Sequence, residues 1–308
     1  KAPASASALS WRCPHYDRQK QNKLAQYRME SYKLQYVSDI HLEKTAVPPP
    51  NLLLEPLAPD LALCGDIGDP FSQIYADFLL WCSKRWARVF LIAGNHEYYT
   101  DRQEHKTIEQ VDNHIAALCK KTANNIFFLQ KSIYFIEEYK IAIIGATLWS
   151  APSVRSWDRL TEKGEYNAIY KRDENTDKLR CLEPTDIINK HLEHKAFLEK
   201  ELGPYNSSVP KDYRVIVLTH YMPTYHLLTP EFQDNALKTT YASDLDNLMK
   251  EPVVAWLCGH SHSPRTIRFP SGTLASLNPL GYKTQDKNLF SRTAHITVYR
   301  ENIAIRRD

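Results

Sequence analysis

Five short polar motifs follow apolar runs in this chain of 308 residues. They carry Asp, Asn and His, side chains that can bind divalent metals and move protons. Ligand sites of open α/β sheets form beyond the carboxyl ends of strands, so motifs at five such ends predict one polar site built from loops. In chain order the motifs are Asp39-Ile40-His41, Gly65-Asp66-Ile67-Gly68-Asp69, Gly94-Asn95-His96-Glu97, Thr219-His220 and Gly259-His260-Ser261-His262.

The donor types in these motifs indicate a metal centre. Carboxylate, amide and imidazole donors suit Zn, Mn, Fe, Co or Ni, and no cysteine stands in a ligand position. The motifs offer more ligands than one ion takes, but they suit two ions that share a carboxylate and lie about 3.5–4 Å apart. Such a pair lowers the pKa of a bridging water and neutralises the attacking and leaving oxygens, as phosphoryl transfer requires.

The five motifs resemble the pattern D-x-H, G-D-x-x-D, G-N-H-[ED], H and G-H-x-H of the calcineurin-like metallophosphoesterase superfamily. The resemblance covers nearly the whole chain after its first 30 or so residues. It implies two divalent metal ions (Mn, Fe, Zn or Co) and a water or hydroxide that bridges them as the nucleophile. The implied ligands are Asp39, His41 and His262 for the first ion, Asn95, His220 and His260 for the second, and Asp66 for both.

The resemblance also implies two catalytic residues that are not ligands. His96 is expected to face the phosphate and either protonate the leaving oxygen or stabilise its charge. Asp69 is expected to orient His96. A structural interpretation of Asp69 stays open beside this one, because an Asp before Pro70 would also cap a helix.

Residues next to Asp69 bear on the substrate class. Protein Ser/Thr phosphatases follow this Asp with Arg-Gly, whereas this chain has Pro70 and Phe71, so the arginine that grips phosphate is missing there. We therefore expect a phosphodiester or phosphomonoester of a small molecule or nucleotide as the substrate. A Ser/Thr protein phosphatase with the same dinuclear centre, a nuclease and a non-catalytic scaffold remain alternatives. Residues 277–282 are either a turn at the site edge or a plain Asn-Pro turn.

Short apolar runs and helical patterns alternate along the chain. Runs of four to six apolar residues are typical of strands buried on both faces. Together with the resemblance they predict an α/β fold, a two-sheet β-sandwich flanked by helices. The expected strands are Leu34–Val37, Leu61–Cys64, Val89–Ala93, Ile141–Gly145, Tyr213–Leu218 and Val253–Cys258, then Thr266–Phe269, Thr273–Leu277, Ala294–Tyr299 and Asn302–Arg306; the expected helices are Phe71–Arg85, one through Ile108 to Leu118, and Thr185–Leu202.

We expect an N-terminal extension over residues 1–30 and a catalytic domain over residues 31–308, with a charged insertion at 150–184. The insertion either shapes a pocket over the metals or forms an exposed loop, and Tyr98 and Tyr99 are further candidates for substrate contact. Trp256, Cys64 and Cys258 are expected in the core, and His191 and His194 at the solvated surface. His226 follows a ligand on the same loop, where a structural role is favoured over contact with substrate. The candidate pocket residues of the insertion are Tyr166, Asn167, Tyr170, Lys171 and Arg172.

Charge and composition limit the partners. The chain has a formal net charge of +3, but residues 1–33 carry a net charge of +5, so the remaining 275 residues carry a net charge of −2. The basic start is either a solvated terminus or a site for an anionic partner, while the body lacks the basic, aromatic stripe of a nucleic-acid binder. No stretch reaches the roughly 18 apolar residues of a membrane span. The six cysteines are scattered, which favours a reducing compartment and a cytoplasmic location. Oligomeric state is not predicted.

Overall fold

The computed structural model describes residues 31–44, 48–100, 104–153, 156–157, 166–233, 235, 237–282, 289–299 and 303–306. The expected extension over residues 1–30 lies outside these ranges, as does Cys13. The other five cysteines are free thiols, and Cys64 and Cys258 are buried as predicted.

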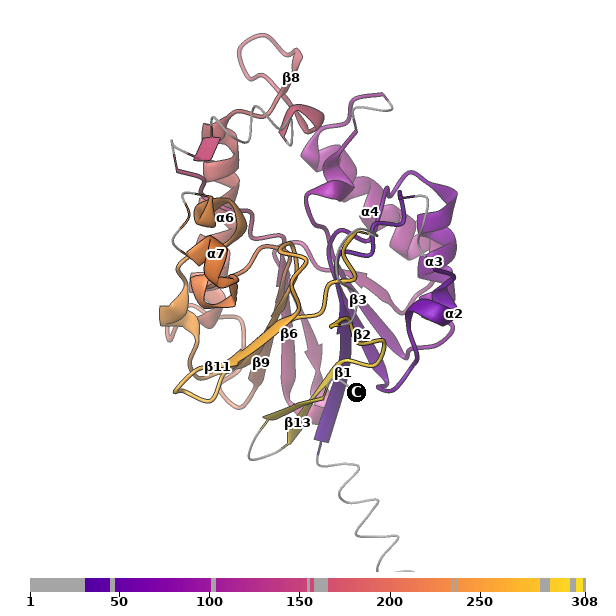
Figure 1. Cartoon of the computed structure of the whole chain (residues 1–308), viewed down its shortest axis with the longest axis vertical. Helices are drawn as coiled ribbons and strands as arrows, with labels where there is room; N and C mark the ends of the chain where they lie inside the picture. The colour runs from indigo at the N-terminus through magenta and orange to yellow at the C-terminus, as the bar shows by residue number, and fades with distance from the viewer. Residues whose placement is uncertain are drawn as a thin grey trace, which may run out of the picture.

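Two six-stranded sheets pack face to face (Figure 1). In the first, β1, β2, β3 and β4 are parallel, β13 is antiparallel to β1, and the edge strand β14 is antiparallel to β13. In the second, β12, β10, β9 and β6 are parallel, and antiparallel β11 and β5 form the two edges. The first sheet has the order β14 (Ile303–Arg306), β13 (His295–Tyr299), β1 (Ser31–Val37), β2 (Asp60–Cys64), β3 (Arg88–Ile92), β4 (Ile126–Phe128). The second has the order β11 (Arg265–Arg268), β12 (Leu274–Leu277), β10 (Val253–Cys258), β9 (Arg214–Thr219), β6 (Ile141–Ala146), β5 (Ser132–Ile136).

The apolar runs form these strands because both of their faces are covered. β2 and β6 are buried at every residue. Alternate side chains of the central strands, such as Ala62, Phe90 and Ile216, fill one cluster between the sheets. The intervening side chains, such as Leu63 and Val217, join a second cluster with residues of the helices. Trp256 is fully buried, as expected.

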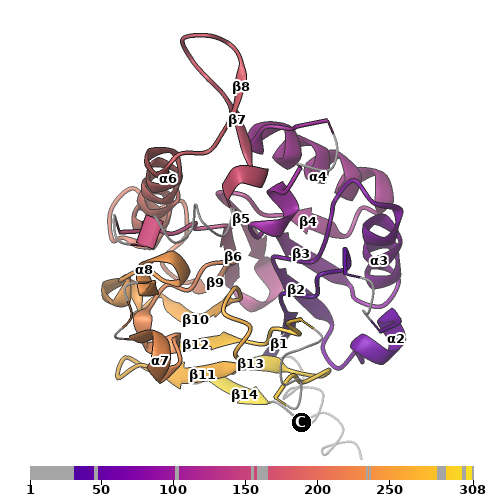
Figure 2. The same cartoon turned by 45° about the horizontal axis from the view of Figure 1, so that its top comes forward.

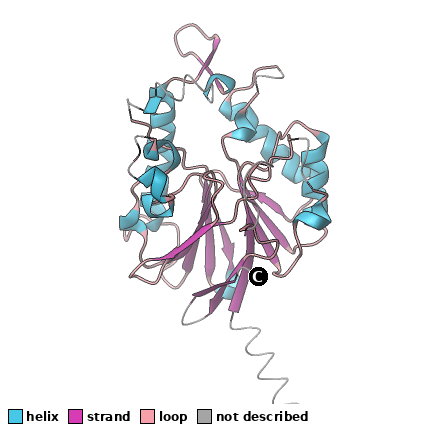
Figure 3. Cartoon of the chain, viewed as in Figure 1, coloured by secondary structure: helices cyan, strands magenta, loops and turns pink. Residues whose placement is uncertain are grey.

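Helices cover the outer faces of the sandwich (Figures 2 and 3). The helices α2 (Pro50–Leu53), α3 (Gln73–Ser83) and α4 (Ile108–Thr122) lie on the side of the first sheet, and α6 (Pro184–Leu202), α7 (Pro230–Gln233) and α8 (Lys238–Tyr241) on the side of the second. The predicted α/β sandwich flanked by helices is therefore confirmed. Among the described residues, no helix has the length and apolar character needed to cross a membrane.

The start of α3 differs from the prediction. Its cap is Ser72, whose side chain accepts the backbone N–H of Tyr75. Asp69 instead closes the turn before the helix, where its Oδ1 accepts the N–H of Phe71 at 2.9 Å and its carbonyl accepts the hydroxyl of Ser72 at 2.6 Å. The helix begins two residues later than expected, because Ser72 can cap the first turn once Asp69 has reversed the chain.

The expectation that His191 and His194 are solvated is wrong. Both are buried on the inner face of α6, 6% and 3% exposed. His194 Nδ1 accepts the N–H of Leu148 at 3.1 Å, and His191 Nδ1 lies 3.2 Å from the carbonyl of the same residue. Burial lowers the pKa of both imidazoles. Leu148 and Trp149 have left-handed backbones, with φ of 73° and 49°, so the two histidines support a strained loop after β6.

Candidate metal centre

The five motifs lie on loops that follow β1, β2, β3, β9 and β10, at one end of the sandwich. The parallel order of β1, β2 and β3 in one sheet, and of β9 and β10 in the other, brings these strand ends to a common edge. This is the arrangement that the strand-end motifs predicted.

Most of the predicted ligands occupy strained backbone positions. A positive φ is uncommon for residues with a side chain, and it aims the side chain where ordinary backbone would not. Clustering of such residues in one place marks a functional site. The residues with left-handed backbone are Asp39 (53°), His41 (54°), Asp66 (52°), His260 (75°) and His262 (54°).

Two motif glycines let these loops approach each other. A Cβ on Gly94 would lie 2.2 Å from Asp66 Oδ1, and one on Gly259 would lie 2.6 Å from Asp39 Oδ2. Both contacts are too short for any side chain, so the motif loops can meet only over glycine. Asp39 gains from this approach, since the backbone N–H of His260 donates to both of its oxygens at 3.0 and 3.1 Å.

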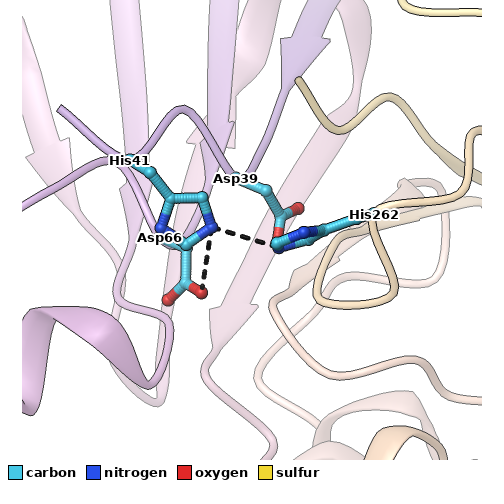
Figure 4. Close-up of side chains that lie close together, drawn as sticks. All are labelled: Asp39, His41, Asp66 and His262. Carbon is cyan, nitrogen blue, oxygen red and sulfur yellow. Dashed lines mark hydrogen bonds and ion pairs between the residues drawn. The ribbon is translucent and has the colours of Figure 1, made fainter. Parts of the chain in front are cut away.

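Asp39, His41, Asp66 and His262 form a first cluster, in which one ligand atom from each lies within 4.8 Å of the others (Figure 4). His41 Nε2 is 3.1 Å from His262 Nε2 and 3.9 Å from Asp66 Oδ2, and His262 Nε2 is 3.2 Å from Asp39 Oδ1. Two nitrogens that each lie 2.0–2.1 Å from one ion are about 3 Å apart. The spacing of the two imidazoles therefore fits a single metal ion.

Asp66, His220 and His260 form a second cluster of the same kind. His220 Nδ1 is 3.0 Å from the carbonyl of Cys64, to which it donates, so Nε2 keeps its lone pair for a metal. That Nε2 faces Asp66 Oδ2 at 3.5 Å and the amide oxygen of Asn95 at 3.1 Å. The amide nitrogen of Asn95 donates to the hydroxyl of Tyr99 at 2.8 Å, which holds the amide oxygen towards the cluster.

Asp66 belongs to both clusters. Its Oδ2 lies between His41 Nε2 and His220 Nε2, while Oδ1 accepts the N–H of His96 at 2.8 Å. The structure thus brings all seven predicted ligands together, in two groups with a shared carboxylate. Oxygen and imidazole donors in this arrangement fit two divalent ions of the borderline type.

The charges of the centre also fit bound cations. Burial opposes ionisation of Asp39, but His262 outweighs it and lowers the pKa of Asp39 to about 2. Burial likewise opposes protonation of His220, yet Asp66 and Asp39 raise its pKa to about 9. Buried carboxylates therefore draw positive charge onto a neighbouring imidazole, which is charge that divalent ions would supply.

Glu97 has a structural role that the motif alone did not reveal. Its buried carboxylate accepts four backbone N–H groups: Oε1 those of Ile67 and Gly68 at 2.7 and 3.4 Å, and Oε2 those of Asp66 and Gly94 at 2.9 and 2.7 Å. The side chain joins the loop after β2 to the loop after β3. Asp66, which both clusters share, and His96 depend on that junction for their positions.

We expect Glu97→Gln to destabilise the fold by roughly 3 kcal/mol, because either orientation of the amide directs an NH₂ group at buried N–H donors. In a chain of this length the loss would lower the melting temperature by roughly 5 °C, because the entropy of unfolding grows with chain length. Calorimetry of the purified variant measures it, with the exposed Glu104→Gln as the matched control. An unchanged melting temperature would contradict this role.

His96 lies beside these two clusters and forms a third group with His41 and Glu43, in which the ligand atoms lie within 4.8 Å of one another, so its role as a residue that is not a ligand stays a prediction. Its Nδ1 is 3.1 Å from Glu43 Oε1, and its Nε2 is 3.2 Å from the hydroxyl of Tyr282 and 4.0 Å from Asp66 Oδ2. Glu43 was not expected from the sequence. Glu43 and Tyr282 thus lie at the two ring nitrogens of His96, while the carboxylate of Asp69 accepts the N–H of Phe71. The role of Asp69 in orienting His96 stays a prediction.

Tyr282 ends the segment 277–282, which lies at the site edge. The N–H of Leu280 donates to the carbonyl of Ser38 at 3.1 Å and that of Gly281 to the carbonyl of Asp39 at 3.0 Å. Asn278 is fully buried and donates to the carbonyls of Tyr36 and Ser291. Of the two interpretations of this segment, the turn at the site edge is the correct one.

The described part of the insertion packs beside the loop that carries His96. The N–H of Thr100 donates to the carbonyl of Ala168 at 3.0 Å, and Thr107 pairs with Tyr170 at the start of the hairpin of β7 (Tyr170–Arg172) and β8 (Leu179–Cys181). Lys171 binds Asp186 at 3.0 Å and lines, with Arg172, a cavity of about 560 Å³ against α4 and α6. None of the predicted metal ligands lines that cavity.

The other candidates for substrate contact have structural partners. Tyr98 is buried and its hydroxyl donates to Asp112 at 2.6 Å, whereas Tyr99 stacks near His96 with ring centroids 4.5 Å apart. Tyr166 is buried and stacks on Trp157. His226 is exposed and lies 3.2 Å from Asp246, in line with the structural role favoured for it.

Comparison with known families identifies the class of this protein. The family model "Calcineurin-like phosphoesterase" matches residues 35–264, a span that contains all seven predicted ligands and His96. The chain belongs to this family and is a phosphoric ester hydrolase.

Individual proteins similar to this chain share less than 30% of its residues. An uncharacterized protein of Acanthamoeba polyphaga mimivirus is 28% identical over 287 residues, which are 86% of this chain and 96% of that protein. The phosphopantetheinyl hydrolase of Mycobacterium tuberculosis superposes with a TM-score of 0.59 at 18% identity, over 82% of this chain and 90% of its own. A dimetal phosphatase from Danio rerio gives a TM-score of 0.49 at 12% identity, over 89% and 95% of the two chains. At 18% identity, the superposition on the phosphopantetheinyl hydrolase concerns the fold alone.

Proposed function

We propose that this chain hydrolyses a phosphodiester or phosphomonoester of a small molecule or nucleotide at a centre of two divalent ions. Asp66 carries the proposal, because one carboxylate lies in both ligand clusters. Asp39, His41 and His262 complete the first set of ligands, and Asn95, His220 and His260 complete the second. Two bound ions would lower the pKa of water and neutralise charge on the phosphoryl oxygens.

The chain's own residues position the reacting groups. The N–H of His96 is held by Asp66 Oδ1, so the catalytic imidazole has a fixed place relative to the shared carboxylate. Nε2 of His96 lies 4.0 Å from Oδ2 of Asp66. From there His96 delivers a proton to the leaving oxygen or stabilises its negative charge.

Two features of the chain support a small substrate. Pro70 and Phe71 stand where a phosphoprotein phosphatase has the phosphate-binding arginine, and Phe71 stacks on His114 instead. Ala168 and Tyr170 of the insertion contact Thr100 and Thr107, so the insertion packs beside the segment that follows His96. A small-molecule substrate also fits the net charge of −2 on residues 34–308, because a long nucleic acid needs a basic groove.

Metal removal and reconstitution test the proposal. Protein dialysed against a chelator should lose all hydrolysis of bis-p-nitrophenyl phosphate, and should regain it with two equivalents of Mn, Fe, Zn or Co, counted by elemental analysis. A panel of monoesters, nucleotides, cyclic nucleotides, phosphopeptides and oligonucleotides then ranks the substrates. Faster turnover of phosphopeptides would favour a protein phosphatase. Full metal occupancy without turnover of any ester would indicate a scaffold.

A further inference from the structure

Glu43 stands between the metal centre and the catalytic histidine. Its Oε1 is 2.9 Å from Nδ1 of His41, a predicted ligand of the first ion, and 3.1 Å from Nδ1 of His96. The side chain is 17% exposed, and its other oxygen is buried with no hydrogen-bond partner among the described residues. The contacts recorded for this carboxylate are thus to the two histidines.

The contact with His41 sets which nitrogen of that ring can bind metal. A carboxylate accepts hydrogen bonds only, so His41 Nδ1 carries the proton and Nε2 keeps the lone pair. Nε2 is the atom that faces His262 and Asp66 in the first cluster. A carboxylate behind a ligating imidazole fixes its tautomer and increases its basicity, and losing it typically weakens metal binding about 10–100-fold.

The contact with His96 sets the second ring in the same way. Nδ1–H of His96 donates to the same oxygen of Glu43, which leaves Nε2 to exchange the proton. This Nε2 faces the hydroxyl of Tyr282 and Oδ2 of Asp66. The two rings are packed edge to face, with centroids 4.5 Å apart.

We infer that Glu43 is a positioning residue that couples the first metal site to proton donation by His96, an inference that rests on the proposed function. In the reaction the water oxygen forms the new P–O bond, and the ester P–O bond breaks with its electron pair going to the leaving oxygen. The leaving oxygen takes the proton from Nε2 of His96, while Nδ1 of His96 keeps its proton and its hydrogen bond to Glu43. The proton lost by the water passes to solvent, which later reprotonates His96.

The resemblance implied Asp69 as the residue that orients His96, and that role stays a prediction, while the hydrogen bonds of Nδ1 of His41 and Nδ1 of His96 go to Glu43. The carboxylate of Asp69 accepts the N–H of Phe71 in the turn before α3. The carboxylate of Glu43 reaches both histidines from the loop after β1, where the N–H of Lys44 donates to the carbonyl of His41 at 2.9 Å and closes the turn.

The test is Glu43→Gln in the full chain, with exposed Glu55→Gln as the matched control. Turnover of diphenyl phosphate and of bis-p-nitrophenyl phosphate is measured at saturating metal, because phenolate needs a proton far more than p-nitrophenolate does. We expect kcat to fall about 10²-fold on the diphenyl ester and by about tenfold or less on the nitrophenyl ester. The affinity of the first site for Mn²⁺, measured by titration calorimetry, should fall about 10–100-fold. Glu55→Gln should match the wild type.

Equal losses on both esters, or unchanged affinity for Mn²⁺, would overturn the inference, because a general structural role does not depend on the leaving group. A third ion per chain would also overturn it, since a cation would then lie among His41, Glu43 and His96 in place of shared protons. If Glu43→Gln fails to fold, Glu43→Asp is measured instead and must show the same steeper dependence on the leaving group. A wild type that is inactive on all esters refutes the proposed function itself, whereas an active wild type with normal Glu43→Gln kinetics refutes only this inference.

Discussion

Asp66→Asn is expected to bind neither divalent ion stoichiometrically and to lose more than about 10³-fold in turnover. Oδ2 of Asp66 is the oxygen common to both clusters, so removing its charge weakens both sites. Loss of a single electrostatic group at a transition state already costs about 10²–10³-fold, and here two cations go with it. Elemental analysis of purified protein gives the metal content, and bis-p-nitrophenyl phosphate reports the activity.

Asn was chosen because it keeps the acceptor for the N–H of His96, which Asp66 Oδ1 holds at 2.8 Å. The matched control is Asp60→Asn, at the other end of the same strand β2. Asp60 is fully buried and binds Tyr32 and Arg88, so the control is expected to lower stability while keeping both ions. Two ions per chain in Asp66→Asn would refute the bridge. Loss of metal in Asp60→Asn as well would show that unfolding, and not the missing ligand, is responsible.

His96→Ala is expected to keep both ions and to lose about 10²–10⁴-fold in kcat, the usual contribution of a positioned acid. His96 is not among the seven predicted ligands of the two clusters, and its imidazole contacts Glu43 and Tyr282. The loss should be larger for esters with poor leaving groups, because these need the proton most. Metal content by elemental analysis and kcat on the two aryl esters test both statements.

The control for this variant is His226→Ala, on the loop after His220. His226 is exposed and pairs with Asp246, so we expect near-normal turnover. Full activity of His96→Ala would remove His96 from the mechanism. Loss of the ions in His96→Ala would instead make it a ligand, contrary to the assignment.

Much of the fold was predictable because the strands are buried on both faces. An apolar run such as Leu61–Cys64 has no other stable environment, and it forms β2 as expected. The motif residues at the ends of such runs then had to converge, since parallel strands end at a common edge. The positions of Asp66 and His220 in one centre follow from this rule alone.

The helix α6 shows where the pattern was insufficient. His191 and His194 look like surface residues in sequence, and no rule for single residues distinguishes a polar surface face from a face that meets a polar loop. They are buried because that face packs on the strained backbone of Leu148 and Trp149. The N–H of Leu148 needs an acceptor, which is His194, and its carbonyl needs a donor, which is His191. The backbone groups that these histidines bind belong to the loop after β6, more than 40 residues away in the sequence.

The sequence motifs and their resemblance to a known family were enough to predict which side chains come together as candidate metal ligands, because metals favour these donor types and buried parallel strands end at one edge. Only the tertiary structure decided which atom of each ring faces the centre. His41, His96 and His220 each have two nitrogens, and the choice depends on a second contact: Glu43 for the first two and the carbonyl of Cys64 for the third. Glu43, His96 and Tyr282 lie far apart in the chain, so no local pattern could show that their hydrogen bonds would meet.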